Sequence, residues 1–189
     1  SMFNRGKKIL ISLAVLLWGG ICFAGQISVQ IVQHNQALDY VSEQSYIVED
    51  ELLNGFFEKG YIVTNSLAQI SDSAEIDSEL LTTGFGEAYD GYSDYFVQVK
   101  IYYDASTNNG PADASQCRLD HIDWVMLKCS SGETLKSSSV KGSKVKPGTD
   151  ENIRQASYTL ISDIQKRFYK HMLNARYNKI LLNSFEKLG

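Results

Sequence analysis

The residues best suited to chemistry lie in one short run, Asp120-His121-Ile122-Asp123, where an imidazole stands among carboxylates. Such a group could bind a metal ion or move a proton. The run falls in a segment whose pattern is typical of a strand, and successive side chains of a strand point to opposite faces. His121 therefore shares a face with Asp123 only, which favours a solvent-facing, hydrogen-bonded histidine over a catalytic or metal-binding one.

Other reactive patterns are incomplete. His34 and His171 have no paired spacing, and we expect both to be exposed. Gly84-Phe85-Gly86 lacks the third glycine of a nucleotide-binding loop, and the serines form no G-x-S-x-G elbow and no S-x-x-K pair. The sequence thus predicts a non-enzyme with no catalytic, cofactor-binding or metal-binding residues. A hydrolase with a loop-built site and a carrier of a small apolar ligand stay open as alternatives.

Three cysteines are present, of which Cys22 lies near the start of the chain. An extended strand between Cys117 and Cys129 would separate their sulfur atoms by about 40 Å. A disulfide requires Cα atoms about 5.5 Å apart. We therefore expect free thiols, although a bend or bulge in the strand would still permit a disulfide.

The first 24 residues have the three parts of an export signal. Ser1 precedes the initiating Met2 and is left out of the fold. Basic residues up to Lys8 lead into an apolar run from Ile9, which ends at the small-x-small triplet Cys22-Phe23-Ala24. The 16 residues from Ile9 to Ala24 are fewer than the roughly 20 that a spanning helix needs. We expect cleavage after Ala24, with a retained anchor or lipidation of Cys22 as the alternatives.

Cleavage would leave residues 25–189 as one soluble periplasmic domain with a C-terminal helical tail. That segment carries 15 basic and 22 acidic residues, a formal net charge of −7. Nucleic acids and anionic lipids both require clustered Lys and Arg, so the overall charge argues against either as the main partner. We expect envelope proteins as partners, and membrane contact only through an uncleaved signal or a lipid. Self-association stays open.

The pattern of apolar residues predicts an α/β (α+β) fold with the order β-α-β-α-β-β-β-α. A mixed sheet of about five strands should carry its helices mainly on one face. The first helix should begin after Ser42 as its cap and end at Gly60, with Tyr46, Leu53 and Phe57 along its apolar stripe and Val48, Leu52 and Phe56 at its flanks. The predicted strands are Ile27–Gln33, Tyr61–Thr64, Tyr95–Tyr103, Leu119–Cys129 and Thr134–Val140, and the other helices cover 71–91 and the chain from about Asp150, with a break near Asn174.

Two sets of aromatic and apolar residues are candidates for an interaction surface. On the strand Tyr95–Tyr103, Phe96 and Tyr102 share one face with polar residues between them, and tyrosine is enriched at interfaces. Packing beneath a second helix would explain the same two residues. In the tail, an apolar stripe could contact this domain or another chain, and its members are Tyr177, Ile180, Leu181 and Phe185.

Four segments resemble a superfamily of bacterial envelope domains that includes the curli secretion protein CsgG, the N-terminal domain of TolB and LpoB. The run 51–63 is similar to its helix–Gly–aromatic–strand unit, and Ser93-Asp94-Tyr95 to the start of its central strand. The hairpin around Ser130-Ser131-Gly132 and the helix from Ala156 to Phe168 complete the likeness. The long 108–117 loop and the tail after Asn174 depart from it, and no membrane-barrel segments are evident. The resemblance implies an exported binding or assembly module without catalytic residues.

Overall fold

The computed structural model describes residues 25–35, 38–104, 118–141 and 150–186, with the side chains of the last helix described as far as Phe168. The export segment lies outside these residues. The strands are β1 (Gly25–His34), β2 (Tyr61–Asn65), β3 (Gln69–Ile70), β4 (Tyr95–Asp104), β5 (Arg118–Lys128) and β6 (Thr134–Lys141). The helices are α2 (Glu43–Glu58), α3 (Ala74–Asp90) and α4 (Asp150–Glu186).

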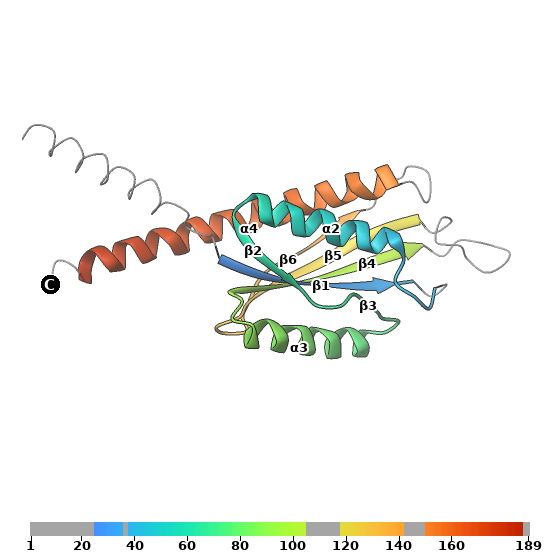
Figure 1. Ribbon diagram of the computed structural model, residues 1–189, viewed down its shortest axis with the longest axis horizontal. Coiled ribbons are helices and arrows are strands. Elements are labelled where there is room, and N and C mark those ends of the chain that lie inside the picture. The colour runs from blue at the N-terminus through green and yellow to red at the C-terminus, as the bar shows by residue number, and fades with distance from the viewer. Residues whose placement is uncertain (1–24, 36–37, 105–117, 142–149, 187–189) are drawn as a thin grey trace, which may run out of the picture.

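The strands form one mixed sheet in the order β2-β1-β4-β5-β6, and the two-residue β3 pairs with β1 beyond the end of β2. β1 is parallel to β2 and β4, whereas β5 and β6 continue the sheet antiparallel. Helices α2 and α4 cover one face and α3 lies on the other (Figure 1). The predicted mixed α/β architecture and element order are confirmed. The sequence did not predict β3, because two residues are too few to show the alternating pattern of a strand.

Local sequence signals correctly predicted the two ends of helix α2. Ser42 caps it by accepting a hydrogen bond from the Ser45 amide, and Gly60 follows it with a φ of 90°, as its sequence predicts. The predicted flanking residues Val48, Leu52 and Phe56 are buried, whereas Tyr46 and Phe57 of the predicted stripe are exposed, which corrects the centre of the buried face. The buried face also includes three polar residues, which hid its extent in the sequence. Its residues are Gln44, Ser45, Val48, Glu49, Leu52 and Phe56.

The main core lies between the sheet and the α2–α4 layer. Alternate residues of the three long central strands point into it, and apolar residues of α4 at spacings of three and four close it. Helix α4 is one continuous helix without the predicted break near Asn174. Residues buried completely in this core include Ile27, Val97, Trp124, Leu160 and Ile164.

A polar tie fixes α4 to the two antiparallel strands. Trp124 on β5 donates its indole N–H to Asp163 Oδ2 at 2.9 Å, and Arg167 Nε donates to Oδ1 at 3.0 Å. Burial disfavours the charged carboxylate, but hydrogen bonds from Trp124, Arg167 and Ser138 outweigh this cost. Together they hold the pKa of Asp163 below its ordinary value.

Helix α3 packs on a sheet face that is largely polar. Gln98 Nε2 donates to Gln30 Oε1 at 3.0 Å, and Gln30 Nε2 donates to the carbonyl of Leu80 in α3 at 2.8 Å. The helix approaches this closely because Gly84 faces the sheet. A Cβ at Gly84 would lie 2.7 Å from Gln30 Nε2 and 2.7 Å from Phe96 Cζ. Among the described residues, no helix is long and apolar enough to cross a membrane.

Two glycines that stand two residues apart on α3, on nearly opposite sides of the helix, give a matched test of this packing. We expect Gly86→Ala to stabilise the fold by about 0.5–1 kcal/mol through helix propensity, because nothing lies within 4 Å of its Cβ position. Gly84→Ala should destabilise it by about 1–2 kcal/mol, since overpacking outweighs the same propensity gain. Thermal unfolding of both variants measures the difference. Equal shifts would show that α3 does not pack tightly on the sheet.

Candidate functional site

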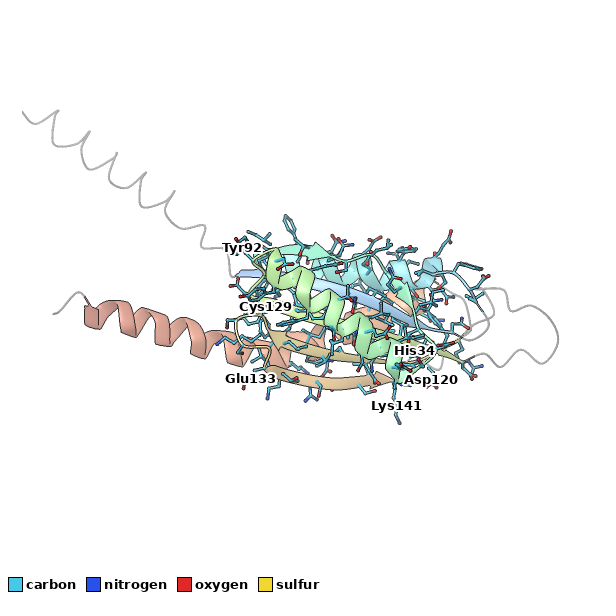
Figure 2. The ribbon with its side chains drawn as sticks, turned by 90° about the horizontal axis from the view of Figure 1, so that it is seen from below. His34, Tyr92, Asp120, Cys129, Glu133 and Lys141 are labelled. Atoms are coloured by element: carbon cyan, nitrogen blue, oxygen red, sulfur yellow. The ribbon has the colours of Figure 1, made fainter. Side chains whose placement is uncertain are left out.

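Three aromatic rings from adjacent strands stack at one end of the α3-side sheet face. The His34 ring on β1 lies 4.4 Å from the Tyr102 ring on β4, and Tyr102 lies 4.2 Å from His121 on β5. The strand register explains the stack, because His34 pairs with Tyr102 and Tyr102 pairs with His121. Figure 2 shows His34, Asp120 and Lys141 gathered at this end.

The ring stack lies at the point in the sheet where the connections that follow two neighbouring strands lead to opposite sides. After β1 the chain returns through α2 to β2, whereas β4 is followed by β5 on its opposite side. His34 and Tyr102 thus lie at the carboxyl ends of two neighbouring parallel strands whose connections diverge. Open α/β sheets commonly bind ligands at such a switch point.

Carboxylates already engage the ring nitrogens. Asp77 Oδ1 in the first turn of α3 lies 2.7 Å from His34 Nε2, and Lys100 Nζ lies 3.8 Å from the same carboxylate. Asp120 Oδ2 lies 2.5 Å from His121 Nδ1, and Asp123 Oδ2 lies 3.7 Å from its Nε2. In the described part of the chain, no three His, Cys, Asp or Glu side chains converge in a way that could hold a metal ion.

The sequence-based expectation for Asp120 needs correction. We expected Asp120 to point away from His121, but the β4–β5 register shifts so that Tyr102 opposes His121 while Tyr103 opposes Leu119. Asp120 is the extra residue of this bulge, and a bulge redirects the residue it adds. Its carboxylate therefore lies beside the imidazole. Regular alternation along the strand gives no signal for such a bulge.

His34 is the residue that sequence reasoning missed. Its side chain is only 15% exposed, whereas exposure was expected. The available signal was its alternation with Ser28 and Gln30 on the polar face of β1. That pattern does not reveal that α3 covers this face. His171 lies outside the residues with described side chains.

The interaction surface expected on β4 is also corrected. Phe96 is 0% exposed and packs edge-on against Phe85 of α3, and Tyr102 is held between the two histidine rings. Phe96 therefore serves the packing alternative, because α3 covers β1 and β4, whereas a role of the partly exposed Tyr102 in an interface stays a prediction. The predicted tail residues Tyr177, Ile180, Leu181 and Phe185 belong to α4, and their side chains lie outside those described.

A second site lies at the opposite end of the sheet, between the end of α3 and the β5–β6 turn. It is an open cleft with a volume of about 520 Å³. Figure 2 shows Tyr92, Cys129 and Glu133 at this end, away from His34 and Asp120. The cleft is lined by Tyr89, Asp90, Tyr92, Ser93, Asp94, Tyr95, Lys128, Cys129 and Ser130.

Ser93 and Asp94 join three strands beneath the cleft. Asp94 Oδ2 accepts the Gln26 amide of β1 at 2.8 Å, and the Asp94 amide donates to the Gln26 carbonyl at 2.9 Å. The Asp94 carbonyl accepts the Cys129 amide at 3.0 Å, which ties the end of β5 to the start of β4. Ser93 Oγ accepts Gln26 Nε2 at 3.0 Å. The Ser-Asp-Tyr segment singled out in the sequence is therefore a structural clamp.

The clamp fixes a short turn that presents two tyrosines. Tyr92 has a φ of 59°, which is costly for a residue with a bulky side chain. Its amide donates to the Tyr89 carbonyl at 3.1 Å. Tyr92 is 89% exposed and Tyr89 is 58% exposed. An aromatic residue held in a strained conformation without packing has no evident role in stability.

Cys129 closes the floor of the cleft and is 3% exposed. Burial, and then the charge of Asp94, raise the pKa of its thiol to about 11. Cys129 is free, as expected, whereas Cys117 lies outside the described residues. A buried, protonated thiol is a poor nucleophile.

The fold and the two sites define a single-sheet α/β domain with an internally paired polar cluster at one end and an aromatic cleft at the other. A protein family described as "Uncharacterised protein" matches residues 26–171, and the chain belongs to this family. A search of curated proteins finds no significant match.

Several solved structures are similar in fold. The PelC dodecamer from Paraburkholderia phytofirmans is 10% identical, with 76% of this chain and 86% of that chain covered and a TM-score of 0.42. The LpoB C-terminal domain from Salmonella enterica is 10% identical, with coverages of 64% and 83% and a TM-score of 0.36. TolB from Acinetobacter baumannii is 15% identical, with coverages of 76% and 28% and a TM-score of 0.36. LpoB and TolB were named by the sequence resemblance, whereas the likeness to CsgG stays a prediction.

The state of Cys129 predicts its reactivity. In residues 25–189 carrying Cys117→Ser, we expect iodoacetamide at neutral pH to label Cys129 about 100-fold more slowly than in guanidinium chloride, because the native thiol is buried and protonated. Mass spectrometry of the labelled peptide measures both rates. Rapid labelling of the folded protein would mean that the cleft floor is open.

Proposed function

We propose that this chain is a non-enzymatic interaction module of the bacterial cell envelope, which residues 1–24 direct out of the cytoplasm. It binds an envelope protein through Tyr89 and Tyr92 at the rim of the cleft. The observation that carries this proposal is the strained, 89% exposed Tyr92 beside a second exposed tyrosine. Tyrosines supply large, rigid contact area and are common among the residues that dominate interface affinity.

The charges around the cleft add to this proposal. Asp90 and Asp94 line the cleft together with the two tyrosines, and Lys128 is its single basic lining residue. An acidic, aromatic rim is suited to a basic side chain of a partner, which could stack on a tyrosine face and pair with a carboxylate. The partner segment we expect is therefore a loop or terminus that presents Arg or Lys.

The rival functions lack comparable support. An enzyme built on His121 would need a cleft around it, whereas the described cleft lies at the other end of the sheet and is lined by neither His34 nor His121. The carboxylates beside those histidines occupy their ring nitrogens. An apolar-ligand carrier would need space between sheet and helices, where Phe56, Trp124 and Leu160 instead pack fully buried.

Tyr92→Gly gives a sharp test, because it should separate stability from binding. Glycine relieves the positive φ, so the free energy of unfolding should rise by up to about 1 kcal/mol. Loss of the ring should weaken partner binding about 30-fold, the effect of a typical interface hot spot. The measurements are thermal unfolding and capture of partners by residues 25–189 from detergent-solubilised envelope, read by mass spectrometry.

Tyr158→Ala is the matched control for this experiment. Tyr158 is 56% exposed on α4, far along the chain from the cleft, and its replacement should leave partner recovery unchanged. Tyr89→Ala should behave like Tyr92→Gly in binding. Equal recovery by wild type and by the Tyr92→Gly protein would refute the assignment of the binding surface.

A further inference from the structure

The net charge of the chain conceals two oppositely charged parts. Residues 25–168 contain 11 basic and 21 acidic residues, a formal net charge of −10. Residues 169–189, here called the basic tail, contain 4 basic residues and Glu186 as their single acidic one, a formal net charge of +3. The negative net charge of the whole chain therefore does not exclude anionic lipid as a partner of the tail.

The backbone places the basic tail outside the domain core. The buried residues of α4 in the described part end at Phe168, and the helix continues to Glu186. Figure 1 shows this last part of α4 extending past the edge of the sheet, at the end where β1 begins. The segment that precedes β1, with its apolar run from Ile9, joins the domain at this same end.

The sequence of the tail has the pattern of a helix that lies on a membrane surface. Apolar residues recur at spacings of three and four, and basic residues stand between them. Two of the apolar residues are aromatic, which is common at the depth of lipid headgroups. The apolar set is Leu173, Tyr177, Ile180, Leu181, Phe185 and Leu188, and the basic residues among them are Arg176, Lys179 and Lys187.

We propose that the basic tail binds the surface of a bilayer that contains anionic phospholipids. The apolar residues enter the headgroup region, while the basic residues pair with lipid phosphates. Repulsion between the same lipids and the domain of charge −10 turns the domain away from the bilayer. This inference goes beyond the proposed function and does not rest on it, because the tyrosine rim is a separate surface.

A protein or a nucleic acid could bind the tail in place of a lipid surface. A nucleic acid would require the basic residues but no continuous apolar stripe. A protein groove would accept the stripe, but the excess of three positive charges would contribute little unless that groove were acidic. A lipid surface with negative charge uses both properties of the tail at once.

Co-sedimentation of residues 25–189, which include every described helix and strand, with lipid vesicles tests this proposal. We expect binding to phosphatidylcholine vesicles that contain phosphatidylglycerol, weakened by salt, and little binding to phosphatidylcholine alone. Arg176→Gln, Lys179→Gln and Lys187→Gln combined should weaken binding about 100-fold, since each basic residue near such a surface contributes about fivefold.

The matched control removes the same charge from the domain. Lys59→Gln, Lys136→Gln and Lys141→Gln combined affect exposed lysines and should change vesicle binding less than about 3-fold. Ile180→Ser with Leu181→Ser should also abolish binding, although the charge is unchanged. Circular dichroism and thermal unfolding verify that each variant is folded.

Two results would overturn the proposal. One is that the protein does not bind anionic vesicles, or that it binds them equally well after the basic residues of the tail are neutralised. The other is loss of a captured envelope protein in the tail variants without any vesicle binding by the wild type, which would make the tail a protein-docking helix. Because Tyr92→Gly should bind vesicles normally, a failure here is distinguishable from a failure of the proposed function.

Discussion

The hydrogen bonds of Ser93 and Asp94 are the constraint on which the rest of the domain depends. They align the start of β4 with β1 through Gln26 and with the end of β5 through Cys129, so three strands share one register. That register stacks His34, Tyr102 and His121 at the far end of the sheet. At the near end, the same bonds fix the turn that holds Tyr92 in its strained conformation.

The two ends of the sheet consequently differ in character. At the His34 end, carboxylates pair with the histidine rings, and a cluster of that kind strengthens the sheet. At the clamp end, the cleft, the two exposed tyrosines, the start of β1 and the free length of α4 lie together (Figures 1 and 2). The proposed recognition surface and the tail proposed to bind a membrane thus lie at one end of the domain.

The sequence predicted what depends on neighbours along the chain. Ser42 and Gly60 marked the ends of α2, and the alternation in 95–103 identified the central strand. It could not predict features set by distant contacts. Ser45 and Glu49 hid the buried face of α2 because polar residues there find partners only in the folded protein, as Ser45 does with Gln33. The ring stack depends on the register of three strands, which no local pattern reveals. The positive φ of Tyr92 could not be predicted either, because tyrosine is not a residue type that favours it.

Photo-crosslinking in intact cells tests the central claim most directly, namely that the clamp end of the domain is its recognition surface. A photoreactive phenylalanine derivative would replace Tyr92 in one protein and the similarly exposed Tyr158 in another. The account predicts a discrete adduct with one envelope protein from position 92 and none from position 158. Adducts that are the same from both positions, or absent from position 92, would contradict it.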